Sequence, residues 1–201
     1  MCRTVYDLRI FISILLCFAA SYSMAATGEG REIAGVKVSP HITQNGIESK
    51  LVLNGLGIRY KFFFKVYVAA LYLPEADSNS LNILQKLPAN RMMMHITYSE
   101  VPYEKLVSGW VDGFKSNTSS GDYSILESRL KQFNEMFSNL YEGDVVLLDY
   151  LPGEGTRVTI KGVEKGMIKG ADFNRALLSV WLGENPITEE LKSKLLGLPD
   201  D

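Results

Sequence analysis

A run of aromatic and β-branched residues between Leu51 and Pro74 constrains the fold of this chain most. Such residues favour β-strands, and proline ends a strand because it has no backbone N–H to donate. One apolar face follows from alternation, made of Tyr60, Phe62, Phe64, Val66, Val68, Ala70 and Tyr72. The other face changes from charged to apolar along Arg59, Lys61, Lys65, Tyr67, Ala69, Leu71 and Leu73. We therefore predict a strand in the interior of a sheet, with the graded face lining a site. Gly55 and Gly57 precede it, where another backbone can approach closely.

The first 25 residues have the features of a signal peptide. Arg3 and Arg9 precede an apolar run from Ile10 to Ala20, and Ser23-Met24-Ala25 fits a signal peptidase site. We expect an exported protein, periplasmic in a Gram-negative host, whose residues 26–201 form a single domain. A membrane anchor is the alternative, but a span needs about 20 apolar residues. We therefore expect no stable membrane span after cleavage.

Composition excludes several classes of function. Cys2 and Cys17 both lie in the expected signal peptide, so the mature chain has no disulfide and no thiolate metal site. Loss of two cations and one anion with that segment moves the net charge from −2 to about −3, which argues against nucleic-acid binding. The hydrophobic fraction of 46% suits a globular domain with a sizeable core.

The remaining patterns predict an α+β domain in which helices pack on one face of an antiparallel sheet. Further strands are predicted at Arg31–Thr43, Arg91–Ser99, Asp144–Leu151 and Thr156–Lys161. Turns are predicted at Asn45-Gly46, at Pro152-Gly153-Glu154-Gly155 and at Gly162–Gly166, before Met167 and Ile168. Helices are predicted at Ser78–Leu87, Pro102–Ser116, Asp122–Phe137, Asp172–Leu182 and Thr188–Leu196.

Few residues have the spacing of a catalytic or metal site. His41 and His95 are the two histidines, and neither forms a metal-spaced cluster with carboxylates, so we expect no metal and no cofactor. Met92–Met94 fit either a strand core or the adaptable wall of an apolar pocket. One alternative is haem or another planar cofactor, with His95 as an axial ligand. The residue chemistry alone favours binding over catalysis.

Several segments together resemble the chalcone isomerase-like family, most closely its bacterial exported members. They are Asn54-Gly55-Leu56-Gly57-Ile58-Arg59, Lys65–Leu73, Pro102–Leu106, Asp149–Gly153, Gly170–Asn174 and Leu182-Gly183. The resemblance runs from about Gly30 to Gly197. It implies an open-faced sandwich, in which an antiparallel sheet has a helix layer on one face. The family includes plant enzymes that close a chalcone to a flavanone and relatives that bind fatty acids without catalysis.

The resemblance also implies roles for single residues. Arg59 matches an arginine that faces an anionic oxygen of the ligand in both groups. Tyr67 stands where the enzymes have a threonine and the fatty-acid-binding branch has a tyrosine. Tyr103 matches the active-site tyrosine of the enzymes, whereas Trp110 and Asn174 replace an asparagine and a threonine. With three positions changed, no residue is assigned as catalytic.

We therefore predict a non-catalytic binder of an amphipathic or aromatic small molecule such as a fatty acid, with Arg59, Tyr67 and Tyr103 at the ligand. A buried carboxylate needs a cation and hydrogen-bond donors, which an arginine and a tyrosine supply. The alternative is an isomerase, an intramolecular lyase acting on a chalcone-like substrate. On one straight strand Arg59 and Tyr67 would lie about 26 Å apart, so a shared head group requires a bend. Otherwise Arg59 forms a surface ion pair, Tyr67 lies in the core, and Tyr103 and Trp110 only pack their helix.

Overall fold

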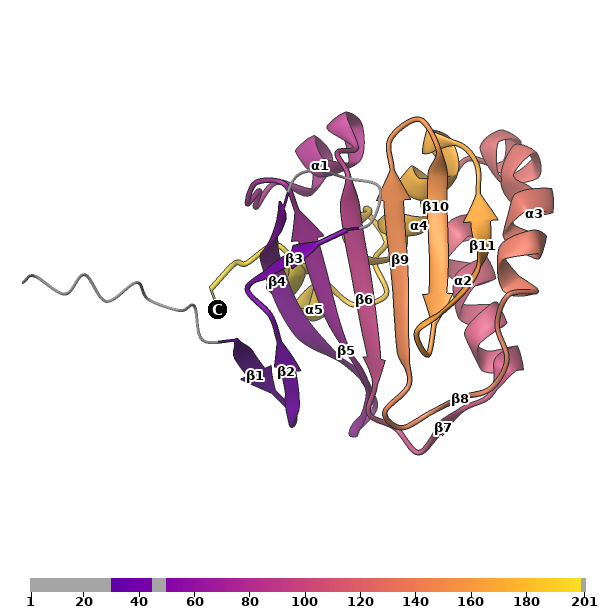
Figure 1. Ribbon diagram of the computed structural model, residues 1–201. Helices are drawn as coiled ribbons and strands as arrows, with labels where there is room; N and C mark the ends of the chain where they lie inside the picture. The colour runs from indigo at the N-terminus through magenta and orange to yellow at the C-terminus, as the bar shows by residue number, and fades with distance from the viewer. Residues whose placement is uncertain (1–29, 45–49, 200–201) are drawn as a thin grey trace, which may run out of the picture.

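The computed structural model describes residues 30–44 and 50–199 (Figure 1). The predicted signal peptide and the predicted turn at Asn45-Gly46 lie outside these residues. The strands are β1 (Arg31–Ile33), β2 (Val36–Val38), β3 (His41–Thr43), β4 (Lys50–Lys61), β5 (Phe64–Leu73), β6 (Asn90–Ile96), β7 (Glu100–Val101), β8 (Leu140–Tyr141), β9 (Val145–Leu151), β10 (Gly155–Ile160) and β11 (Val163–Ile168). The helices are α1 (Ser80–Lys86), α2 (Tyr103–Asn117), α3 (Ser120–Asn134), α4 (Ala171–Leu182) and α5 (Glu189–Leu195).

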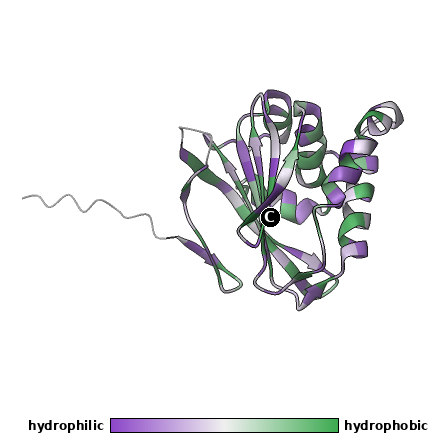
Figure 2. Ribbon diagram, turned by 45° about the vertical axis from the view of Figure 1, so that its right-hand side comes forward, coloured by the Kyte–Doolittle hydropathy of each residue, from purple (hydrophilic) through white to green (hydrophobic). Residues whose placement is uncertain are grey.

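Seven of these strands form one antiparallel sheet in the order β11-β10-β9-β6-β5-β4-β3. The helices lie on one side of it (Figure 2), and the larger hydrophobic cluster fills the space between the two layers. A smaller cluster on the other face packs the β1–β2 hairpin against β4 and β5. The structure confirms the predicted α+β open-faced sandwich. Within the described residues, no helix combines the length and apolarity that a membrane span requires.

The Leu51–Pro74 run is a hairpin and not one strand, which corrects the prediction. β4 ends at Lys61 and β5 begins at Phe64, so Phe62 and Phe63 make the turn. Phe62 has a φ of 55°, a left-handed conformation that two-residue hairpin turns normally assign to glycine or asparagine. The reversal therefore carries none of the usual turn residues.

The predicted faces of β5 are correct from Tyr67 onward. Its odd-numbered residues pack in the helix-side cluster, and Val68, Ala70 and Tyr72 pack on the opposite side. The expected continuation of an apolar face through Phe62 and Phe64 is wrong, because both side chains are exposed at the turn. The alternation of apolar residues continues through the turn in the sequence, but the sheet ends at the turn and cannot bury their side chains.

Gly55 and Gly57 provide the close backbone approach that the sequence predicted. A Cβ built on Gly55 would lie 2.2 Å from the carbonyl oxygen of Lys194, and one on Gly57 would lie 2.7 Å from the Cβ of Lys194. Helix α5 therefore packs directly on the β4 backbone. Thr188, the first residue of the predicted helix, caps it through its side chain.

Two other predicted segments differ from the structure, and a left-handed turn contributes to each difference. The predicted strand Arg31–Thr43 is three short strands. Ala34 and Gly35 reverse the chain between β1 and β2 with φ of 51° and 78°, and Ser39 and Pro40 separate β2 from β3. The predicted turn at Gly162–Gly166 is largely strand β11, since Lys161 and Gly162 make the reversal with φ of 55° and 76°.

All five predicted helices are present, with ends that shift by a few residues. Ser119 caps α3 by accepting a hydrogen bond from the backbone N–H of Asp122, so this helix begins and ends earlier than predicted. Pro102 lies at the N-cap of α2 and not in its first turn. In α1 the buried residue is Ile83, whereas Leu81 is exposed.

A buried ion pair links three strands on the sheet face opposite the helices. Arg91 of β6 donates two hydrogen bonds to Asp149 of β9, from Nε at 2.5 Å and from an Nη at 2.8 Å. Arg157 of β10 lies 3.5 Å from the same carboxylate. These residues are cross-strand neighbours, and Asp149 is almost completely buried. The bidentate geometry and the second arginine offset the cost of burying the carboxylate.

Candidate ligand-binding site

A pocket of about 180 Å³ lies between the β4–β6 part of the sheet and helices α2 and α4. Its lining is largely apolar and consists of Arg59, Lys61, Val66, Tyr67, Met94, Ile96, Val101, Lys105, Leu106, Gly109, Trp110, Val180 and Ile187. A cavity of this size is smaller than the roughly 300–1,000 Å³ of most ligand sites.

The hairpin register places Arg59 and Tyr67 directly opposite each other at this pocket. Tyr60 pairs with Lys65 and Arg59 pairs with Tyr67, so Val66 is an extra residue in β5. This bulge brings Tyr67 rather than Val66 across from Arg59, as bulges near functional sites often do. The separation of about 26 Å expected for one straight strand therefore does not apply, because the two residues are cross-strand neighbours.

Tyr67 is a neutral hydrogen-bonding group inside the pocket wall. The indole Nε1–H of Trp181 donates to the Tyr67 hydroxyl at 3.1 Å. Burial raises the pKa of Tyr67 from 10.0 to about 12, although this hydrogen bond and the nearby Arg59 charge act to lower it. The phenol thus stays protonated at neutral pH. Because its oxygen accepts from Trp181, its own proton can be donated to an acceptor in the pocket.

Trp110 forms another part of the wall and carries a buried donor. Its side chain is only 3% exposed, and its ring packs edge-on against Trp181 with centroids 5.5 Å apart. Within the described residues, its Nε1–H has no hydrogen-bond partner. A buried donor left unpaired costs about 1–3 kcal/mol, so the Trp110 N–H is an unsatisfied donor in the wall of the pocket. The sequence interpretation missed this role, although an indole N–H is always a donor.

The structure does not bring Tyr103 and Asn174 to this pocket. Tyr103 lies at the start of α2 and lines a separate hollow beside Tyr141 and Lys161. Asn174 is buried in α4, where it donates to the Thr156 hydroxyl at 3.1 Å and accepts from the Asn90 amide at 3.2 Å. The Arg59, Tyr67 and Trp110 positions meet at one pocket, and the other two positions implied by the resemblance lie elsewhere.

The histidines and methionines of the sequence interpretation separate onto two faces. Met92 and Met94 are buried on the helix side, and Met94 lines the pocket. His95 pairs with Val68 and therefore lies on the opposite face of the sheet. His41 is exposed on β3. The described part of the chain contains no group of three or more histidine, cysteine, aspartate or glutamate residues placed to hold a metal ion.

A second hollow of about 240 Å³ adjoins the first. It shares Lys61, Val66, Val101 and Lys105 with the pocket. Its remaining lining residues are Phe62, Phe64, Tyr98, Glu100 and Pro102. The two hollows therefore lie side by side, the first at the Arg59–Tyr67 pair and the second at the hairpin turn. Lys105 was not singled out in the sequence, because a lone lysine on a helix carries no pattern.

Comparison with known proteins agrees with the segments identified in the sequence. The sequence model of the chalcone isomerase-like family matches residues 30–197. The chain belongs to the chalcone isomerase-like family. A crystal structure of a fatty-acid binding protein from Arabidopsis thaliana has the same fold, with a TM-score of 0.64 over 81% of this chain and 92% of that chain. Identity between the two is 16%. No curated protein matches the sequence.

Proposed function

We propose that this chalcone isomerase-like protein binds an amphipathic carboxylate, such as a fatty acid, without turning it over. The observation that carries the proposal is the cross-strand pair of Arg59 and Tyr67 at the end of an apolar pocket. The similar Arabidopsis protein is described as a fatty-acid binding protein, which supports the same class of ligand.

The donor set suits a carboxylate head group. Arg59 supplies a permanent positive charge, and the Tyr67 hydroxyl and the Trp110 indole supply two neutral donors. Charge-assisted hydrogen bonds of this kind are roughly twice as strong as neutral ones. The apolar walls and the adjoining hollow then accommodate the aliphatic chain, in the direction of the hairpin turn. The two hollows together reach the size range of a ligand site.

The pocket offers little for acid–base catalysis. A general base works best with a pKa near the operating pH, and the Tyr67 pKa of about 12 is far above it. Among the described residues, the lining includes neither a histidine nor a carboxylate. Anion binding without proton transfer is the function that these groups support.

A displacement titration with a fluorescent fatty acid tests the head-group assignment. Arg59→Ala removes a hydrogen bond to a charged group, worth about 1.5–3 kcal/mol, so affinity should fall about 10- to 150-fold. Arg31→Ala, at an exposed arginine of β1, is the matched control and should bind as the unchanged protein does. Equal affinity of Arg59→Ala and Arg31→Ala would reject the assignment.

Incubation with a chalcone tests the catalytic alternative. Ring closure also occurs without an enzyme, so the readout is the chirality of the flavanone. The expected product is racemic at the uncatalysed rate. A stereoselective product that Arg59→Ala abolishes would show an isomerase and contradict the proposal of binding alone.

We also propose that the protein acts outside the cytoplasm, on the basis of the basic, apolar and small-residue pattern in residues 1–25. Intact mass measurement of the protein released from an expressing bacterium should give a chain that starts at Ala26. A mass that includes residues 1–25 would refute the proposed export.

A further inference from the structure

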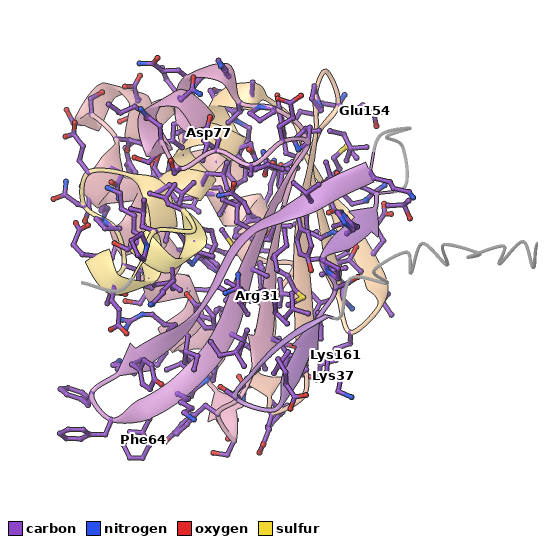
Figure 3. The ribbon with its side chains drawn as sticks, turned by 90° about the vertical axis from the view of Figure 1, so that its left-hand side faces the viewer. Arg31, Lys37, Phe64, Asp77, Glu154 and Lys161 are labelled. Carbon is purple, nitrogen blue, oxygen red and sulfur yellow. The ribbon has the colours of Figure 1, made fainter. Side chains whose placement is uncertain are left out.

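Three consecutive phenylalanines project from the turn between β4 and β5. Phe62, Phe63 and Phe64 are 84%, 95% and 57% exposed. The Phe64 ring packs edge-on against the half-exposed Tyr98, with centroids 5.6 Å apart. Figure 3 shows Phe64 at the far end of the hairpin, where side-chain rings point away from the molecule. The other large exposed apolar residues of the described chain are Leu81, Ile125, Tyr141, Val163 and Leu198, which come from separate elements.

Folding does not explain this choice of residues. Phe62 holds a left-handed φ of 55°, where glycine or asparagine fits without strain. The three rings also contribute almost nothing to either hydrophobic cluster, since none of them is part of one. A strained aromatic at an exposed turn, next to a pocket, indicates that these rings act outside the fold.

Positive charge surrounds the aromatic turn. The cations are Lys61 and Lys65 on the two strands, with Arg59 and Lys105 lining the adjacent hollows. Among the residues described around those hollows, Glu100 is the acidic one, and it accepts a hydrogen bond from Asn139. Four cations therefore lie around the turn and the two hollows against this one acidic residue, in a chain whose net charge is −2.

We infer that the β4–β5 turn docks the protein on an anionic lipid bilayer. The three phenylalanine rings enter the boundary between head groups and acyl chains, and the surrounding cations contact the anionic head groups. Binding to such an interface combines buried apolar area with attraction to anionic lipids, and both contributions are present here. Tyr98 suits the head-group level, where amphipathic rings collect.

A second copy of the chain fits this surface less well. Two copies that joined turn to turn would bring the same lysines together, and like charges at an interface are unfavourable. The docking surface does not require the proposed ligand. The docking surface nevertheless borders the proposed binding site, because Phe62 and Phe64 line the hollow that adjoins the Arg59–Tyr67 pocket.

Co-sedimentation with vesicles tests the inference, using the protein released from the exporting host. Vesicles of equimolar phosphatidylglycerol and phosphatidylcholine should retain the protein, and those of phosphatidylcholine alone should not. Phe63→Ser should weaken binding at least about tenfold, as expected for loss of one inserted aromatic side chain. Lys65→Ala should weaken it about fivefold, and added salt should weaken it further.

Two further variants separate docking from stability. Phe62→Gly relieves the left-handed strain, so it should unfold at the same or a higher temperature while binding vesicles more weakly. Leu81→Ser removes an exposed apolar side chain from α1, which lies at the other end of the sheet (Figure 1), and should bind as the unchanged protein does. If vesicle binding depended only on the total hydrophobicity of the surface, both variants would bind vesicles equally weakly.

Three results would overturn the inference. They are equal sedimentation with neutral and anionic vesicles, unchanged binding by Phe63→Ser, and a dimer that Phe63→Ser abolishes in a protein that ignores vesicles. The last result would assign the turn to a second copy. Fatty-acid titration of Phe63→Ser without vesicles should match the unchanged protein, since Phe63 lines neither hollow. Failure of docking and failure of ligand binding are therefore distinguishable.

Discussion

Tyr67→Phe is a stringent test of the pocket, because one oxygen atom has two roles there. The substitution keeps the ring in the core but removes the acceptor of the Trp181 Nε1–H, which lies 3.1 Å away. The indole donor is then buried without a partner, whereas water satisfies it in the unfolded chain. We expect the free energy of unfolding to fall by about 1–3 kcal/mol. For a domain of this size, the unfolding temperature should drop by about 2–12 °C.

The same substitution should also weaken ligand binding. The Tyr67 hydroxyl donates to the head group in the proposed complex, and a hydrogen bond to a charged group contributes about 1.5–3 kcal/mol. Fatty-acid affinity should therefore fall about 10- to 150-fold, the same range that we expect for Arg59→Ala. Loss of stability and loss of affinity come from different partners of one hydroxyl.

A double-mutant cycle with Trp181→Phe separates the two effects. Once the indole donor is gone, removal of the hydroxyl leaves no new unpaired group, so Tyr67→Phe should cost little additional stability. The loss of affinity should persist in that background. Urea unfolding followed by circular dichroism measures all four proteins on one scale, and a displacement titration supplies the affinities.

Two outcomes would refute this reasoning. If Tyr67→Phe is as stable as the unchanged protein, the hydroxyl accepts no hydrogen bond from Trp181 in solution. If stability falls but affinity does not, the hydroxyl serves only the core, and the proposed head-group role is wrong.

Further predictions concern packing and charge in the same fold. Gly113→Ala should lower the free energy of unfolding by about 1–3 kcal/mol, because the new methyl would lie 2.8 Å from a valine methyl of α4. Gly109→Ala, with no atom within 4 Å, should raise it by about 0.5–1 kcal/mol in the same urea titration. Asp149→Asn removes the buried anion of the partly buried Arg91 and should cost up to about 3–5 kcal/mol by calorimetry. A hydrogen bond from Arg129 lowers the pKa of Asp172, so this pair stabilises the fold above the unfolded carboxyl pKa and loses its effect as pH falls through the lower folded pKa. Asp172→Asn should therefore differ from the unchanged protein by at most about 1 kcal/mol at neutral pH, and not at all below the folded pKa.

Sequence patterns predicted most of the fold because they report which side of an element is buried. The alternation in β5, the close approach at Gly55 and Gly57, and the capped helix after Thr188 all agree with the structure. Chain reversals were predicted only at segments that contain typical turn residues such as glycine, proline and asparagine. Phe62 reverses the chain with a left-handed backbone that its residue type disfavours, so no local signal revealed that turn, and the turn at Lys161 and Gly162 was predicted too far along the chain.

The site was harder to predict than the fold, because it depends on pairing between strands. The family resemblance singled out Arg59 and Tyr67, but only the hairpin register shows that they face each other. The same reasoning placed Tyr103 with them, although its position at the start of α2 leads to another hollow. The donor of Trp110 was overlooked, since its place in an apolar helical stripe is explained by packing alone.

One turn produces both the pocket and the exposed aromatic surface. Side chains alternate with a period of two along a strand, so the partner of Arg59 depends on the turn length and on the bulge at Val66. A reversal one residue earlier or later would direct Tyr67 away from the helices. The reversal that aligns the pair also leaves Phe62 and Phe63 at the turn and Phe64 exposed at the first residue of β5, beside the hollow that adjoins the pocket. A ligand that reached Arg59 from a bilayer would therefore pass the residues that we propose to hold the protein there.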